Sequence, residues 1–197
     1  MSSLRSSAGF SAIELLVVLA IAGSLAAMSV PFSMQMVDDY RISGDAHDLS
    51  NSVAQAKMSA AAQFTRARLY VDLPTGQYHV DTWRKTGTPG WQQEGGVTLL
   101  NQGSSFGPGE IDVPPPNTQA AVAQAPACRN DAGTAIANTA CIIFNSRGIS
   151  VDEAGAPSAV RLFYLNGPTA VFALAVSGTS QQQLFRVSPG GGTWVQQ

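Results

Sequence analysis

The stretch that decides the fold runs from residue 9 to residue 31 and reads GFSAIELLVVLAIAGSLAAMSVP. Apart from glycine and serine it is apolar, with one carboxylate, Glu14. At about 1.5 Å per residue, positions 10–30 form a helix of about 32 Å, enough to cross a hydrocarbon core of about 30 Å. A carboxylate near the middle of such a span costs about 2.5–3.5 kcal/mol, and somewhat less near one end. Glu14 is either a tolerated defect or a residue with a partner, and we favour a partner because intramembrane carboxylates usually have one.

The residues before the span indicate how the chain is processed. Residues 1–9, MSSLRSSAG, form a short polar leader with one cation, Arg5. An ordinary secretory signal has a small-residue cleavage site after its apolar region, and the only such site, around Ala26 and Ala27, is followed by methionine and, a little further on, proline. We therefore expect cleavage before the span rather than after it.

The pattern G-F-S-x-x-E, followed by a span-length apolar helix that ends at a proline, resembles the class III leader of type IV pilins and type II secretion pseudopilins. The resemblance implies that a membrane prepilin peptidase cuts after Gly9 and methylates the new N-terminus at Phe10. It also places Glu14 at the glutamate position of that family. The implied partners are other pilin or pseudopilin subunits, the peptidase and an inner-membrane assembly platform. The implied location is the inner membrane, with a single pass and a periplasmic head, and then the filament.

A physical argument supports the same role for Glu14. Cleavage after Gly9 would place an ammonium group on Phe10, and Glu14 of a neighbouring subunit could neutralise it in an apolar environment. Breaking a buried pair costs about 3–5 kcal/mol, whereas keeping it adds little net stability, so the pair would set the register between subunits. Gly23 and Pro31 are candidate bend positions, because proline removes a backbone hydrogen bond and glycine lowers helix propensity by about 1 kcal/mol.

Length and charge indicate one domain on a helical stem. We expect a leader at 1–9, a membrane or filament-core helix at 10–30, an amphipathic helix at 31–66 and a β-rich head at 67–197. Of 197 residues only 12% are charged, and the net charge is −2. That charge excludes a global basic field for DNA or anionic lipid.

Two cysteines, Cys128 and Cys141, have no histidine or further cysteine at metal-ligand spacing nearby. A disulfide in an oxidising periplasm is the simpler interpretation, worth about 3 kcal/mol for a loop of this length, and two free thiols are the alternative.

Periodicity predicts the elements after the span. An apolar stripe at helical spacing follows, made of Ile42, Ala46, Leu49, Val53, Ala56, Ala60 and Phe64. Beyond it the period falls to two, which predicts strands at 68–73, 78–83, 97–100, 141–144, 149–151, 160–165, 170–176 and 184–187, and an edge at 193–195. Residues 101–140 are rich in glycine, proline and small polar residues and are expected to form a long loop. The fold class is therefore α+β, a long helix packed on antiparallel sheets.

The segment IIFNSRG at 142–148, with a glycine turn behind it and three late strands, is similar to minor pilins of the GspH/FimT type. This second resemblance implies a minor pilin or pseudopilin that assembles into or caps a filament.

No catalytic, cofactor or metal site is predicted. The G-x-S-x-G match at 103–107 is followed by prolines rather than a helix, and His47 and His79 both precede its serine, opposite to the hydrolase order. The acids Asp38, Asp39, Asp45 and Asp48 lack the spacing of a calcium loop and are interpreted as a solvated helix face.

Three functional classes remain: a filament subunit, a DNA-uptake receptor and a signal-anchored monomeric domain. Some relatives of the GspH/FimT type bind DNA through a basic C-terminal motif. Here the tail carries one cation, Arg186, so nucleic acid is an unlikely partner, and Trp194 is expected to pack on the core. The third class leaves Glu14 unexplained.

Overall fold

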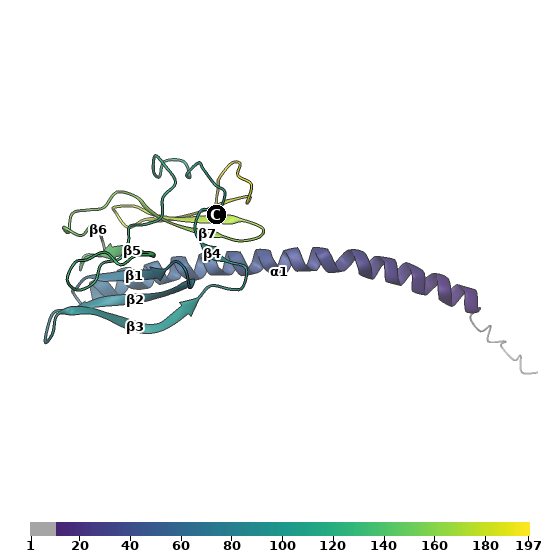
Figure 1. Cartoon of the computed structure of the whole chain (residues 1–197), viewed down its shortest axis with the longest axis horizontal. Coiled ribbons are helices and arrows are strands. Elements are labelled where there is room, and N and C mark those ends of the chain that lie inside the picture. The colour runs from purple at the N-terminus through teal and green to yellow at the C-terminus, as the bar shows by residue number, and fades with distance from the viewer. Residues whose placement is uncertain (1–10) are drawn as a thin grey trace, which may run out of the picture. The chain divides into compact units, whose positions relative to one another are not determined.

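The computed structural model describes residues 11–197, without the side chains of residues 28 and 31 (Figure 1). The expected cleavage residues, Gly9 and Phe10, lie outside the described residues. The chain forms two compact units, one that ends at Val37 and one from Asp38 to Gln197. Each unit is described by itself.

A single helix, α1 (Ala12–Ala62), is the only helix in the described part of the chain. It runs without interruption through positions 23 and 31 and ends at Ala62, before the expected 66. Up to Val37 its described side chains are exposed. It is long and apolar enough to cross a membrane.

From Asp38 onward, α1 carries the buried stripe that the sequence predicts. Six of the seven stripe residues have no exposed surface: Ile42, Ala46, Leu49, Val53, Ala56 and Ala60. The seventh assignment was wrong, because Phe64 is 75% exposed. It lies past the end of the helix with a φ of 49°, where the helical spacing no longer applies.

The end of α1 is a Schellman motif with phenylalanine where glycine is usual. The N–H of Thr65 donates to the carbonyl of Ala60 at 3.1 Å, and the N–H of Phe64 donates to the carbonyl of Ala61 at 3.3 Å. The Lys85 ammonium donates to the carbonyl of Phe64 and helps to satisfy the helix terminus.

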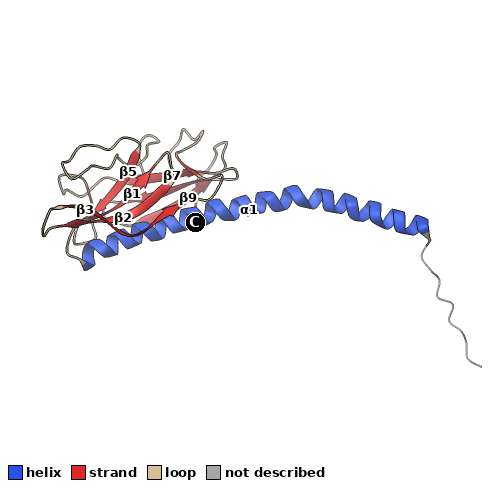
Figure 2. Cartoon of the chain, turned by 60° about the horizontal axis from the view of Figure 1, so that its bottom comes forward, coloured by secondary structure: helices blue, strands red, loops and turns tan. Residues whose placement is uncertain are grey.

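Two five-stranded antiparallel sheets complete the second unit. Sheet A has the order β3-β2-β1-β5-β6, and sheet B has the order β10-β9-β8-β7-β4. The strands are β1 (Ala67–Asp72), β2 (Gln77–Arg84), β3 (Gly90–Leu99), β4 (Ser105–Phe106), β5 (Thr139–Phe144), β6 (Ser150–Val151), β7 (Arg161–Asn166), β8 (Val171–Val176), β9 (Gln182–Val187) and β10 (Val195–Gln196). The predicted α+β class is confirmed: a long helix packs on antiparallel sheets (Figure 2).

The main core lies between the second part of α1 and both sheets. The α1 stripe, Leu69 and Ile142 of sheet A, and Phe163 and Phe172 of sheet B belong to one buried cluster. The helix approaches the β7–β8 turn closely, because a Cβ added to Gly167 would lie 2.8 Å from Cγ1 of Ile42. The small residues of the stripe and this glycine permit that approach.

The predicted long loop at 101–140 contains strand β4 and two packed segments, which we call covers: residues 107–125 on sheet B and residues 126–138 on sheet A. Its first part packs on the outer face of sheet B, where Val122 and Trp194 contact a second buried cluster that includes Tyr164. There the side chain of Gln124 donates to the Tyr164 carbonyl at 3.0 Å and accepts from the Tyr164 N–H at 2.7 Å.

The second part of the loop is fastened to sheet A by the predicted disulfide. Cys128 and Cys141 are bonded, and Cys141 lies in strand β5. The N–H of Cys141 also donates to the Pro126 carbonyl at 2.8 Å, and the N–H of Ile136 donates to the Cys128 carbonyl at 2.7 Å. The bond therefore holds residues 126–138, and the proline-rich segment 114–116 lies in the other cover.

Candidate assembly site

The N-terminal end of α1 is closed by a capping box. The N–H of Ile13 donates to Oγ of Ser11 at 3.2 Å, and the N–H of Ser11 donates to Oε2 of Glu14 at 3.1 Å. Glu14 is thus a helix-capping residue, and its carboxylate lies in the first turn, where the helix dipole favours negative charge. The signal for this role, S-x-x-E ahead of an apolar run, is present in the sequence, but the sequence analysis did not use it.

The cap uses Oε2 of an exposed carboxylate, and among residues 11–197 Oε1 forms no hydrogen bond. Glu14 is also the only charged side chain between Ala12 and Val37. A local capping role and a role toward a partner are therefore compatible, and they can be separated by substitution.

The rest of this first unit is suited to an apolar environment. Its large side chains are exposed, among them Leu16, Leu19 and Ile21 at 64%, 59% and 55%. Its hydroxyls are satisfied within the helix: those of Ser24, Ser29 and Ser33 donate to carbonyls three or four residues earlier, at 2.8–2.9 Å. Such bonds remove the need for water, as a segment in lipid or in a filament core requires.

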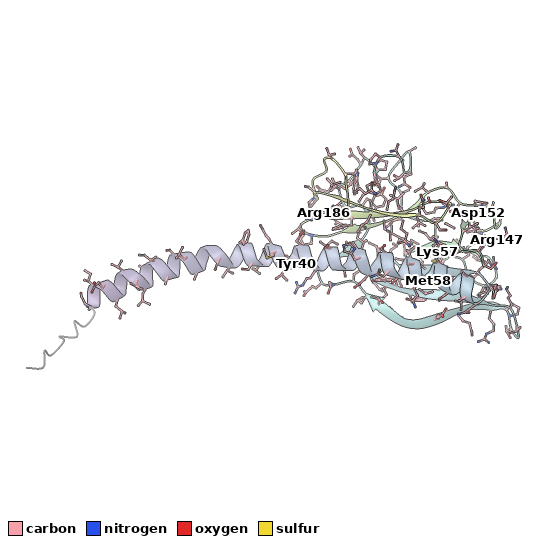
Figure 3. All side chains as sticks on the ribbon, turned by 180° about the vertical axis from the view of Figure 1, so that it is seen from behind. Tyr40, Lys57, Met58, Arg147, Asp152 and Arg186 are labelled. Atoms are coloured by element: carbon pink, nitrogen blue, oxygen red, sulfur yellow. A yellow bond between two sulfur atoms is a disulfide. The ribbon has the colours of Figure 1, made fainter. Side chains whose placement is uncertain are left out.

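The second part of α1 leaves one face uncovered by the sheets. Tyr40 and Met58 are 73% and 64% exposed. Their separation of 18 positions corresponds to about five helical turns, so they lie on one line along the helix (Figure 3). His47, Asn51 and Gln55 lie along the same face and are exposed. This largely polar face is available to a neighbouring chain.

Two aspartates bind α1 to the head, so the expectation of a solvated acidic face was wrong for Asp39 and Asp45, whereas Asp48 is exposed as expected. Asp45 is 3% exposed and accepts hydrogen bonds from the N–H and the side-chain amide of Asn101 at 2.8–3.2 Å. Asp39 accepts from Arg186 at 2.5 Å and from Thr169 at 3.1 Å. Both acids bind partners from the head, which spacing along the helix alone could not indicate.

The tail residues have structural roles. Arg186, the single cation of the tail (labelled in Figure 3), forms an ion pair with Asp39. Trp194 donates its indole N–H to the carbonyl of Val113 at 2.9 Å and packs near Tyr164, with 6.3 Å between ring centres. The expected packing of Trp194 is therefore confirmed.

The serine of the G-x-S-x-G match, Ser105, lies in the two-residue edge strand β4 opposite Asn166. No helix follows it in the described chain. Within the same residues, no group of three or more histidine, cysteine, aspartate or glutamate side chains is arranged to hold a metal ion.

A second cluster, on the outer face of sheet A, was missed by the sequence analysis. Arg68 and Asp81 face each other on β1 and β2, and both are buried. His79 Nε2 lies 3.1 Å from Asp81, and the His79 ring stacks on Tyr70 at 4.8 Å. The sequence contains a signal for this cluster, because polar and aromatic residues occupy every second position on both strands. They are arginine, arginine and tyrosine at 66, 68 and 70, and histidine, aspartate and tryptophan at 79, 81 and 83.

Burial and pairing act in opposite directions in this cluster. Burial alone would raise the pKa of Asp81, but hydrogen bonds and charge from His79 and Arg68 hold that pKa below its usual value. Burial lowers the pKa of the Arg68 guanidinium, and Asp81 opposes that shift. The pair is therefore charged and desolvated at neutral pH.

Comparisons with known proteins find a likeness among solved structures. No protein-family model matches the chain, and no curated protein matches it. Among solved structures, the chain is similar to the minor pseudopilin EpsH from the type 2 secretion system of Vibrio cholerae, at 12% identity and a TM-score of 0.46. The match covers 77% of this chain and 99% of that one.

Proposed function

We propose that this chain is a structural filament subunit, a minor pilin or pseudopilin, that assembles through the N-terminal part of α1. The observation that carries the proposal is the position of Glu14. It is the single charge in an exposed apolar helical segment and lies in the first turn of that segment. The pilin-like leader and the α+β head support the same role.

In this proposal the peptidase cuts after Gly9, and the new ammonium group of Phe10 pairs with Glu14 of a neighbouring subunit. Apolar side chains of residues 12–37 then pass from lipid into a filament core of similar polarity, so the transfer costs little. The uncovered face of α1 that contains Tyr40 and Met58 contacts adjacent heads. The inner membrane, the prepilin peptidase and an assembly platform are the partners of this route.

The experiment compares Glu14→Gln with Glu14→Val. Glutamine serves in a capping box as glutamate does, so Glu14→Gln keeps the cap and removes only the charge. We expect both variants to be processed and inserted, and both to be absent from sheared filaments or pseudopili. Co-purification with the filament and the mass of the N-terminus are measured in the same cells.

The capping role makes a different prediction. If Glu14→Gln enters filaments and Glu14→Val does not, the residue acts through the helix cap, and charge pairing is refuted. Normal entry of both variants would show that Glu14 has no part in assembly.

Processing is tested separately. Mass spectrometry should find a mature chain that begins at a methylated Phe10, and replacing Gly9 with a bulky residue should leave uncut precursor in the membrane. A mature chain cut near Ala27 would refute the proposed route.

A further inference from the structure

A small cleft on the outer face of sheet A contains a guanidinium group with no assigned role. The cleft has a volume of about 130 Å³ and is lined by Arg66, Trp83, Trp91, Arg129, Asp131 and Glu153. Arg66 precedes β1, Trp83 and Trp91 face each other on β2 and β3, and the other three come from the loops 107–138 and 152–160. The cleft therefore joins the aromatic end of sheet A to the disulfide-held cover.

Two of the three arginines at this cleft already have partners. Arg68, beneath it, binds Asp81 at 2.8 Å and the Arg129 carbonyl at 2.5 Å. Arg129 pairs with Glu153 and donates to the Gly133 carbonyl at 2.7 Å. Their donors are directed at groups of the protein itself.

Arg66 is different. Its guanidinium carbon lies 4.8 Å from the centre of the Trp83 ring and 5.8 Å from that of Trp91. Within the described residues its side chain forms no hydrogen bond or ion pair, and it is exposed. Stacking on two indoles holds the guanidinium plane in place, so less side-chain entropy is lost when it binds a partner.

The charge around Arg66 selects the kind of anion. Arg68 and Arg129 are already paired with Asp81 and Glu153, so a polyanion with closely spaced charges would meet one free guanidinium and the repelling carboxylate of Asp131. One isolated carboxylate can use the free fork of Arg66, with two parallel hydrogen bonds. The volume of the cleft fits a single side chain rather than a nucleotide.

Strand β3 offers backbone groups that can bind the peptide backbone from which such a side chain projects. It is the edge strand of sheet A. The N–H of Trp91 points away from β2, because it donates to Asp131 Oδ1 at 2.8 Å. In an antiparallel ladder this direction repeats every second residue, so the N–H and carbonyl of Gln93 also point away from β2, past the part of the edge that Asp131 occupies. Further along, Val97 and Leu99 are 49% and 61% exposed.

We propose that the open edge of β3 and the cleft at Arg66 together bind an extended peptide segment of a partner protein, with one acidic side chain of the segment held by the Arg66 guanidinium. The segment adds a strand to sheet A, and its carboxylate lies beside Trp91. This binding site goes beyond the proposed filament role and does not depend on Glu14.

The test uses the full chain in a neutral detergent and two short capped peptides of alternating threonine and valine. One has a central glutamate and the other a central glutamine. Tryptophan fluorescence reports binding, because two of the three tryptophans line the cleft. We expect saturable binding of the glutamate peptide and about tenfold weaker binding of the glutamine peptide.

Variants locate the site. Arg66→Gln should weaken binding of the glutamate peptide about tenfold. Arg66→Lys should weaken binding less, since lysine keeps the charge without the planar fork. Arg147→Gln is the matched control, because Arg147 is exposed and does not line the cleft, and it should bind like wild type. A glutamate peptide with N-methylated backbone amides should lose binding, because it cannot pair with β3.

Four results would overturn the proposal. They are equal affinity for the two peptides, no saturable binding of the glutamate peptide, unchanged binding by Arg66→Gln, or undiminished binding of the N-methylated peptide. Displacement of the glutamate peptide by duplex DNA at lower concentration would also overturn it, in favour of a polyanion site.

Discussion

Arg68 and Asp81 form a buried ion pair on neighbouring strands, with Nη2 of the guanidinium 2.8 Å from Oδ2 of the carboxylate and both side chains 6% exposed. Removing one partner of such a pair leaves an uncompensated buried charge. We expect Asp81→Ala to lower the free energy of unfolding by about 3–5 kcal/mol, measured by denaturant titration. The double variant Arg68→Met with Asp81→Leu should lose less unfolding free energy than the single variant, because no unpaired buried charge remains. Equal losses in the single and double variants would contradict this account.

The same pair should make stability depend on pH in acid. The pKa of Asp81 is below its ordinary value of 3.8 in the folded chain. The stabilisation is therefore fully present above about pH 4 and is lost as the pH falls through the lower, folded-state pKa. Asp81→Asn should flatten the slope of unfolding free energy against pH in that window. If the unfolding free energy of Asp81→Asn changes with pH in this window as steeply as that of the wild type, other carboxylates cause the acid sensitivity.

Phe64 is a site where a substitution should stabilise the chain. It holds a left-handed conformation, φ 49°, at the position where a Schellman motif usually has glycine, and its ring is 75% exposed. Phe64→Gly should raise the free energy of unfolding by up to about 1 kcal/mol, because the left-handed region costs an L-residue about 1–2 kcal/mol and the extra freedom of glycine in the unfolded chain offsets part of that gain. Phe64→Ala is the control, since it removes the ring but keeps the strained Cβ, and it should give no gain. A loss of stability in Phe64→Gly would show that the ring makes contacts that stabilise the fold.

The disulfide should protect one cover and leave the other unaffected. Replacing Cys128 and Cys141 with serine should cost about 3 kcal/mol for a loop with a sequence separation of 13. Limited digestion with proteinase K, which cleaves after many residue types, should then cut first within residues 126–138, while residues 107–125 stay protected by their packing on sheet B. First cleavage within 107–125 would mean that the bond supports both covers.

Sequence periodicity predicts the helices and strands in which buried residues recur at the regular spacing of that element. The helical stripe from Ile42 to Ala60 and the alternating strands β1 and β2 are of this kind. Strand β3 was predicted only at its end, 97–100, because Trp91 to Gly96 is polar and does not alternate. Its extended conformation comes from pairing with β2, which a local pattern does not record.

The candidate sites differ in the same way. Glu14 was found because a carboxylate in an apolar run is conspicuous within a few residues of sequence. The cluster of Arg66, Arg68, Asp81 and Trp91 was not found, because its members come from three strands and meet only through the register of those strands. The two loop covers were missed for a related reason, since contacts such as that of Gln124 with Tyr164 join residues 40 positions apart.

The last prediction concerns DNA, and it follows from the pairing of the cations. The chain carries 11 lysine and arginine residues against 13 acidic residues. Arg41, Arg68, Arg129 and Arg186 each form an ion pair with an acidic side chain, and the other seven cations are scattered along the sequence rather than clustered, so the chain has no run of cations to displace counterions from phosphates. We expect the full chain in neutral detergent to bind duplex DNA no more tightly than about 10⁻⁴ M near physiological salt, as measured by fluorescence anisotropy. Arg186→Gln should leave that weak affinity unchanged, because Arg186 is already held by Asp39. Micromolar binding with a steep salt dependence, lost in Arg186→Gln, would instead favour a DNA-uptake receptor.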